Sequence, residues 1–394
     1  MGRYDFDTVI DRKGTGCIKY DAQMRRMGRD DLLPLWVADM DFRAPQEVLD
    51  VLKARIDHGI FGYTDPDDAY GDSLVSWFQR RYGVTIQKEW NTVTPGVVYA
   101  LAAAVRAYTK PGDAVIIQQP VYYPFREVIQ DNRRRLVNSQ LIYEDGRYHI
   151  DFDDFERKIY TNSVKLFLLC NPHNPVGRVW TREELQRLGE ICKKHGVTVF
   201  SDEIHCDFVY PGHTFVPFAS VDPSFKEFTV TGTSASKTFN IAGLQCANIL
   251  IPDQDKRRFF RREVAASGYS QGNVLGMVAT KAFYDLGEPW LEELLQYLKG
   301  NLDYVRQYVK DNLPGVSLVE PEGTYLLWLD FGGTGLKPEE LEDLVVNKAR
   351  LWLDGGAIFG KETALFERIN IACPRSILEE AMGRLGDAVK ALQK

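Results

Sequence analysis

The chain has 394 residues, of which 44% are hydrophobic and 26% are charged, and its formal net charge is −7. This length exceeds what one small core needs and predicts two domains in a globular protein. The acidic balance argues against nucleic-acid binding, since Arg133–Arg135 and Lys256–Arg258 are short clusters typical of solvated faces. No apolar stretch approaches the roughly 20 residues of a membrane helix.

The first residues and the cysteines indicate a cellular compartment. Met1–Asp7 contains no apolar signal core, and the six cysteines are scattered without a CxxC pair. This usage is typical of reduced thiols rather than of a disulfide or zinc framework. We therefore expect a cytoplasmic protein without a metal site.

Short apolar runs alternate with helical periodicity from about residue 95 to residue 290. The predicted strands are Ala114–Ile117, Val164–Leu169, Val197–Phe200 and Cys246–Ile251. A helix is predicted over Thr181–His195, where Thr181 and Glu184 form a capping box. Continuous aliphatic runs separated by helices predict an α/β domain, over residues 47–288, with a mostly parallel sheet covered on both faces.

The pattern changes after residue 290. Helices are predicted over Pro289–Asn312, over Pro338–Arg350 and from Ile377 onward, and strands over Thr324–Phe331 and Arg368–Ala372. These elements predict a smaller α+β domain over residues 289–394. We expect residues 1–46 to join this domain or to wrap a partner subunit.

Polar motifs follow two of the predicted strands. Asp202 lies in Ser201–His205, and Asn174 lies in Asn171–Gly177. Ligands of open α/β sheets bind at the carboxyl ends of strands, which is where these motifs fall. The doubled Asn-Pro predicts a rigid loop whose amide can donate a hydrogen bond. A helix-capping aspartate and a plain strand-to-helix turn are the simpler interpretations.

Lys237 closes the small-residue loop Thr231–Lys237. A lysine amine can bind an aldehyde covalently, and a buried carboxylate such as Asp202 can keep a pyridine nitrogen protonated. The two residues together suit the chemistry of pyridoxal 5′-phosphate (PLP). Either residue alone is more often structural, so the interpretation depends on the pair.

Three further signals are weaker. Gly96 precedes the helical stretch Tyr99–Tyr108, and the free amides of a helix start can hold a phosphate, although glycine there is usually only a turn. An aromatic residue of Pro120–Phe125 could stack on a flat cofactor, although core packing is commoner. Arg375, just past a strand, suits capture of a carboxylate; the alternative is a surface arginine at a helix start, where cations are disfavoured.

The motifs occur in one order over nearly the whole chain: Trp36–Phe42, Phe61–Thr64, Thr94–Val98, Asn171–Arg178, Ser201–His205, Thr233–Asn240 and Arg368–Arg375. This set resembles the fold-type I PLP enzymes of the class I/II aminotransferase superfamily. Within it, Val37–Phe42 and Ser201–His205 resemble the MalY/PatB group of cystathionine β-lyases and cysteine-S-conjugate β-lyases. The resemblance implies the aspartate aminotransferase fold, PLP as cofactor, and a homodimer whose subunits share active sites.

The resemblance also implies a role for each matching position. The residues at the cofactor ring are Lys237, which binds it covalently, Asp202 at the ring nitrogen, Asn174 at the ring oxygen, and Tyr122 stacked on the ring. The residues at the phosphate are Gly96, Val97, Val98 and Ser234, with Ser236 beside them and Tyr63 contributed by the partner subunit. The residues at the substrate carboxylate are Arg375, Ala38 and Asn174.

Two positions depart from the superfamily pattern. Gln245 stands where many members have a basic residue on the phosphate, so backbone amides and hydroxyls must contribute more. His205 stands where many aminotransferases have a tyrosine on the ring oxygen, which matches the lyase group.

The resemblance implies a carbon–sulfur β-lyase that acts on an amino-acid substrate. Lys237 removes the Cα proton, a thiolate leaves Cβ, and the remainder hydrolyses to pyruvate and ammonia. Lys237, Asp202, Tyr122 and Tyr63 are the expected catalytic group. An aminotransferase of an aromatic or aliphatic amino acid would use the same residues, and a PLP-fold regulatory protein is an alternative of another class. The leaving group, whether of cystathionine, cystine, cysteine or another S-conjugate, stays open.

Overall fold

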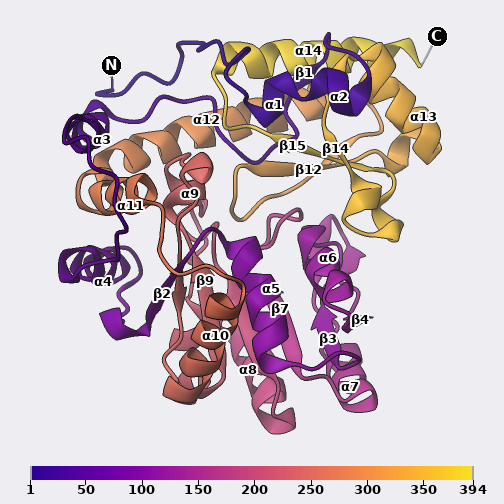
Figure 1. Ribbon diagram of the computed structural model, residues 1–394. Coiled ribbons are helices and arrows are strands. Elements are labelled where there is room, and N and C mark those ends of the chain that lie inside the picture. Colours follow the sequence, from indigo (N-terminus) through magenta and orange to yellow (C-terminus); the bar gives the residue numbers. More distant parts are fainter. Residues whose placement is uncertain (1, 393–394) are drawn as a thin grey trace.

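The computed structural model describes residues 2–392, and its largest feature is a seven-stranded sheet with the strand order β2-β10-β9-β8-β7-β3-β4 (Figure 1). The strands are β2 (Asn91–Thr94), β3 (Ala114–Ile117), β4 (Arg135–Asn138), β7 (Leu166–Cys170), β8 (Thr198–Asp202), β9 (Thr229–Thr233) and β10 (Ala247–Leu250). From β9 to β4 all neighbours are parallel, whereas β10 runs antiparallel to both of its neighbours. The sheet is therefore mixed but mostly parallel, and each predicted strand is present.

The middle strands are buried on both faces, as their continuous apolar runs predict. In β7, Leu166 and Leu168 pack on one face, while Phe167 and Leu169 pack on the other. The first face is covered by α5 (Val97–Tyr108), α6 (Pro124–Asp131) and α10 (Gln254–Ala266). The second is covered by α7 (Phe152–Asn162) and α8 (Arg182–His195), and α8 begins with the predicted capping box of Thr181 and Glu184.

The reversed direction of β10 goes with the lack of a crossover helix before it. Parallel neighbours need a crossover of a dozen or more residues, which is usually a helix across the face of the sheet. Between β9 and β10 the chain forms only α9 (Ala235–Thr238) and a 3₁₀ turn, Ala242–Leu244. This segment carries Lys237 and returns directly to the same edge.

The C-terminal third forms a second layer above the large sheet (Figure 1). Its four-stranded antiparallel sheet has the order β11-β12-β15-β14, from β11 (Ser317–Val319), β12 (Leu326–Asp330), β14 (Asp354–Gly355) and β15 (Phe366–Asn370). Its helices are α12 (Glu288–Asn312), α13 (Pro338–Asp343) and α14 (Arg375–Ala391). The helix predicted over Pro338–Arg350 is shorter, because a π-helical turn follows at Leu344–Lys348 and buries both Leu344 and Val345.

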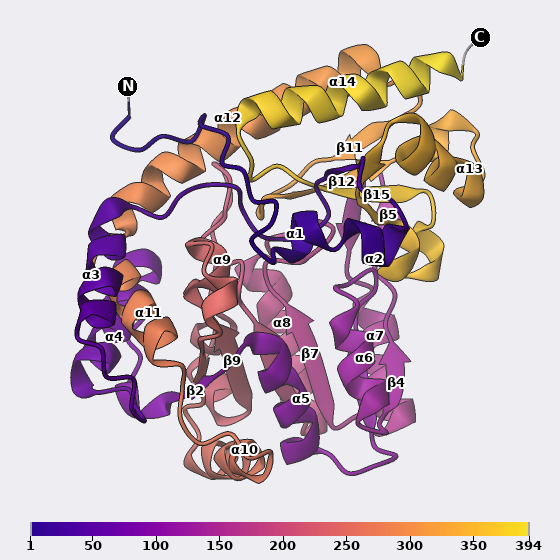
Figure 2. The same ribbon diagram turned by 45° about the horizontal axis from the view of Figure 1, so that its top comes forward.

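The start of the chain lies against these C-terminal elements (Figure 2). It forms α1 (Ile18–Asp21), α2 (Gln23–Met27) and β1 (Leu33–Pro34), and β1 pairs in parallel with β13 (Leu351–Trp352). Trp36 stacks on Trp352 with ring centroids 4.4 Å apart. Residues from the two ends of the sequence therefore share one core.

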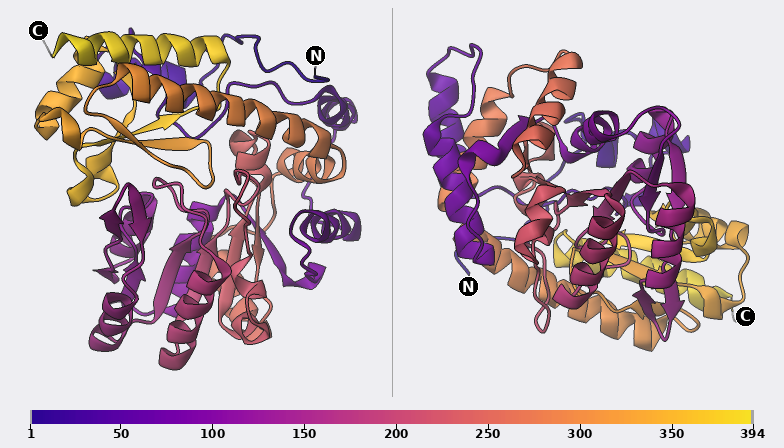
Figure 3. Two further views of the ribbon diagram at one scale, coloured as in Figure 1. Left: turned by 180° about the vertical axis from the view of Figure 1, so that it is seen from behind. Right: turned by 90° about the horizontal axis from the view of Figure 1, so that it is seen from below.

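Three helices flank the large sheet beyond β2: α3 (Gln46–Asp57), α4 (Asp68–Tyr82) and α11 (Val274–Leu286) (Figure 3). A small hairpin of β5 (Ile142–Glu144) and β6 (Arg147–His149) completes the structure. Within residues 2–392, no helix has the length and apolar character needed to cross a bilayer.

Candidate active site

A cavity of about 190 Å³ opens at the carboxyl ends of β7, β8 and β9. It is lined by every site residue that the sequence predicts except Tyr63 and Arg375. The predicted residues that line the cavity are Ala38, Gly96, Val97, Val98, Tyr122, Asn174, Asp202, His205, Ser234, Ser236 and Lys237. Segments that are far apart in the sequence thus meet at one point.

Lys237 lies in α9, a helix held at its start by Ser234. The Ser234 hydroxyl donates to the Cys246 carbonyl at 2.7 Å and accepts the Ser236 amide at 3.0 Å. The Lys237 amine donates to the carbonyl of Ala38 at 2.6 Å. Burial lowers the pKa of Lys237 to about 8, so a large fraction of the amine is neutral near that pH and can act as a nucleophile or base.

Asp202 is the last residue of β8, and its Oδ1 accepts the amide of Ile204 at 3.1 Å. Burial raises the pKa of Asp202 to about 7, while the Ile204 amide and the charge of Lys237 oppose this shift. A cationic N–H group in the cavity would favour the ionised carboxylate. Asp202 is therefore suited to hold a protonated ring nitrogen.

Asn174 reaches the cavity from the loop after β7. Its Oδ1 accepts a hydrogen bond from Arg368 at 3.1 Å, so its Nδ2 is the atom left to donate. The backbone carbonyl of Asn174 accepts the Tyr122 amide at 3.0 Å, which ties the expected stacking residue to the same loop. This arrangement fits an amide that donates to a ring oxygen beside an aromatic plane.

Arg375 does not line the cavity. It is the first residue of α14, where its Nε donates to Asn301 at 2.9 Å and its guanidinium lies over the ring of Tyr304. These contacts stabilise a cation at a helix start, a position that the helix dipole disfavours. Arg375 therefore occupies the position given by the alternative interpretation of the sequence, which was an arginine at a helix start.

Arg368 is the buried arginine beside the cavity, and sequence reasoning missed it. It lies in the middle of β15, forms an ion pair with Asp354 and donates to the Trp36 carbonyl at 2.6 Å. Its Nε is buried without a protein partner among the described residues. Arg368 opens the predicted strand Arg368–Ala372, and an arginine in a strand is a sequence signal that could have identified it, because buried arginines are rare unless paired.

His205 packs its ring against Tyr325, with centroids 5.9 Å apart. Burial, with the charges of Lys237 and Arg368, lowers the pKa of His205 to about 3. The ring is therefore neutral at ordinary pH, and its buried Nδ1 has no protein partner among the described residues. Burial also raises the pKa of Tyr122, which keeps its hydroxyl protonated.

The start of α5 also lines the cavity. Gly96 stands at the N-cap position of this helix, where no side chain caps the first turn, and Val97 and Val98 of that turn line the cavity. The backbone amides of a first turn have no partner inside the helix and favour an anion such as a phosphate. Gln245 is exposed and does not line the cavity, and Tyr63 is 96% exposed.

Comparisons with known proteins agree with this geometry. Residues 30–385 match the family described as aminotransferase class I and II. The chain is 44% identical to cystathionine beta-lyase PatB of Bacillus subtilis, over 98% of this chain and 100% of that protein. Cystalysin of Treponema denticola, whose crystal structure contains a pyridoxal 5′-phosphate cofactor, is 38% identical, covers 99% of both chains and has a TM-score of 0.96. The PLP-bound C–S lyase of Staphylococcus hominis is 35% identical, with 98% of both chains covered and a TM-score of 0.92.

Proposed function

Because this chain belongs to the aminotransferase class I and II family, we propose that it is a PLP-dependent carbon–sulfur β-lyase. It cleaves cystathionine or another cysteine S-conjugate to a thiol, pyruvate and ammonia. The observation that carries the proposal is the meeting of Lys237, Asp202 and the start of α5 in one cavity. The relatives named as cystathionine beta-lyase and C–S lyase support the choice of elimination within the family.

The residues of the cavity fit PLP in their chemistry. The Lys237 amine can bind the aldehyde, Asp202 can hold the ring nitrogen, and Asn174 has an amide left for the ring oxygen. The uncapped first turn of α5 suits the phosphate. When bound, PLP withdraws electrons from the substrate Cα and so makes its proton removable.

The protein's own residues then orient the substrate and move the proton. We assign the substrate α-carboxylate to Arg368 instead of Arg375, because Arg368 is buried beside Asn174 and retains an unpartnered Nε. Ala38 also lines the cavity. Lys237, with its lowered pKa, removes the Cα proton, and the Cβ–S bond then breaks with its electron pair on sulfur.

The test is a product assay on purified protein supplied with PLP and L-cystathionine but no keto acid. We expect pyruvate, ammonia and thiol to form over many turnovers, and we expect Lys237→Ala to form none. A single turnover that resumes only when a keto acid is added would replace the lyase with an aminotransferase.

We further propose a homodimer in which Tyr63 contacts the phosphate of the partner subunit. Tyr63 is 96% exposed beside the exposed apolar residues Ile60 and Phe61, which supports a buried position in an assembly. The proposed division is a large PLP-binding domain over residues 47–288 and a small domain over residues 289–394 joined by residues 1–46. A cytoplasmic location is consistent with six free cysteines.

A further inference from the structure

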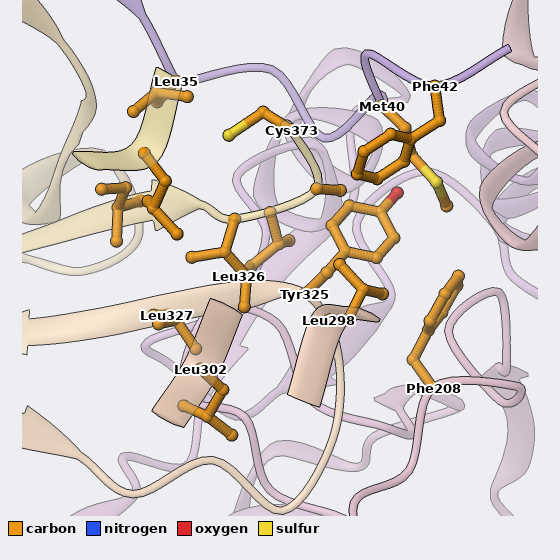
Figure 4. Packing of buried hydrophobic residues seen from close by; sticks show 14 of the residues in the cluster. Leu35, Met40, Phe42, Phe208, Leu298, Leu302, Tyr325, Leu326, Leu327 and Cys373 are labelled. Carbon is orange, nitrogen blue, oxygen red and sulfur yellow. The ribbon is translucent and has the colours of Figure 1, made fainter. Parts of the chain in front are cut away.

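The segment from Trp36 to Asp41 is held by side chains at every carbonyl from Trp36 to Met40. Arg368 donates to the carbonyl of Trp36, Asn370 to those of Val37 and Asp39 at 2.6 Å each, and Asn240 to that of Met40 at 2.8 Å. The central carbonyl, of Ala38, accepts both the Lys237 amine at 2.6 Å and the Tyr325 hydroxyl at 3.1 Å. Figure 4 shows the ring of Tyr325 beside Met40 of this segment and beside Phe42, which follows it. The position of the segment therefore determines where the hydrogen-bond acceptor of the Lys237 amine lies.

A charged cluster from the N-terminal segment fixes the other side of this segment. Lys19, which is 0% exposed, lies 2.7 Å from Oδ2 of Asp41 and 3.8 Å from Oδ1 of Asp39. Arg12 donates to Asp39 and to Asp41 at 2.7 Å each, and also to the Met40 carbonyl at 3.1 Å. Two cations thus balance two carboxylates, and Tyr20 adds a hydrogen bond to Asp41 at 3.2 Å.

We propose that Arg12 and Lys19 are positioning residues, which hold Asp39 and Asp41 so that the Ala38 carbonyl stays against the amine of Lys237. The proposal rests on the proposed function only in that Lys237 is the reacting base. It explains why two aspartates of the Val37–Phe42 motif, which have no role in the proposed reaction, lie within ion-pair distance of a fully buried lysine. Buried ion pairs are weak sources of stability, but they can specify one arrangement of the chain.

The cluster also shapes the charge around Lys237. The charged groups that act on this amine are Asp39, Arg368 and Asp202, with the neutral ring of His205 nearby. Asp39 favours the protonated amine, so a movement of Asp39 away from Lys237, once Lys19 or Arg12 no longer holds it, would increase the neutral fraction. Releasing the Ala38 carbonyl would remove the acceptor that orders the amine. Both changes make Lys237 react faster with an electrophile.

The test measures the rate at which cyanate, a small reagent for neutral amines, carbamylates Lys237 in the cofactor-free protein. The rate is followed by mass spectrometry of the peptide that contains Lys237. For Lys19→Met we expect carbamylation about ten-fold faster than in wild type, the ratio that corresponds to loss of one hydrogen bond to a charged group. Lys256→Met is the matched control, because Lys256 is partly buried and bonds Thr198 at the opposite end of β8. We expect the control to leave the rate at Lys237 unchanged.

Arg12→Met serves as a second variant because Arg12 is partly exposed and its loss is better tolerated. Rates at Lys237 equal to wild type in folded Lys19→Met and Arg12→Met proteins would overturn the proposal. The double variant Lys19→Met/Asp41→Asn should lie closer to wild type than Lys19→Met, since it leaves no uncompensated buried carboxylate. With PLP bound, Lys19→Met should retain its cofactor content but show a raised KM for L-cystathionine. A protein without elimination activity would contradict the proposed function while leaving the cyanate result intact.

Discussion

At the scale of single residues, substitutions of Arg368 and of Arg375 are expected to affect substrate binding differently. Replacing Arg368 with lysine keeps the charge but removes the two-pronged geometry that suits a carboxylate. We expect kcat/KM for L-cystathionine to fall about 100-fold, mostly through KM, because a bidentate charged pair is lost. Arg375→Lys is the matched control and should stay within about three-fold of wild type, since Arg375 bonds Asn301 outside the cavity. Steady-state kinetics on both variants test which arginine binds the substrate carboxylate. A larger loss of kcat/KM in Arg375→Lys than in Arg368→Lys would assign the carboxylate to Arg375.

Arg368 and Arg375 also show which parts of the site could be predicted from the sequence. Lys237, Asp202 and Asn174 could be placed from the sequence because each follows a strand whose carboxyl end faces the ligand edge of a parallel sheet. Arg375 was predicted from its place just past a strand, which suits capture of a carboxylate, and from the family resemblance. The small sheet that contains this strand is antiparallel, so its strand ends do not share one ligand edge. Arg368, in the middle of β15, instead contacts Asn174, which lines the cavity.

At the scale of elements, Gly232 sets how closely α5 approaches the sheet. A Cβ added at Gly232 would lie 2.8 Å from the ring of Phe200 and 3.0 Å from Val97, the first residue of α5. We expect Gly232→Ala to lower the free energy of unfolding by about 1–3 kcal/mol, because the core there is already full. It should also weaken PLP binding, since the first turn of α5 is the proposed phosphate site.

Chemical denaturation of the cofactor-free protein and a PLP titration measure the two effects. Gly383→Ala is the matched control, because Gly383 lies in α14 with no atom within 4 Å of an added Cβ. It should raise stability by roughly 0.5–1 kcal/mol through helix propensity and leave PLP affinity unchanged. Unaltered PLP affinity in Gly232→Ala would show that α5 accommodates the extra methyl group.

The helices and strands could be predicted from the sequence where the local pattern of apolar and capping residues was strong. The capping box of α8 and the apolar runs of β3, β7 and β8 predicted their elements to within a few residues. The direction of β10 did not follow, because it depends on the chain that connects it to β9 rather than on its own residues. The π-helical turn after α13 did not follow either, because it depends on the packing that buries Leu344 and Val345.

At the scale of the whole molecule, a shared active site predicts complementation between two damaged subunits. In the proposed homodimer, Lys237→Ala removes the base of its own site, whereas Tyr63→Ala damages the site of its partner. When the two variants are unfolded together and refolded as a mixture, about half of the dimers should be hybrids with one intact site each. We therefore expect activity to return to about a quarter of the wild-type value, against little in either variant alone. Failure of the mixture to regain activity would place Tyr63 outside the partner's site.

The parallel pairing of β1 with β13 bears on how the chain matures during synthesis. The strands of the large sheet are all available once residue 250 has emerged, but Leu33 and Pro34 pair with Leu351 and Trp352. Domains of large proteins fold as units while the chain is made, and contacts between distant residues form late. The first segment of the chain to be synthesised is thus among the last to find its place, and the Ala38 carbonyl meets Lys237 in its final setting only after nearly the whole chain exists.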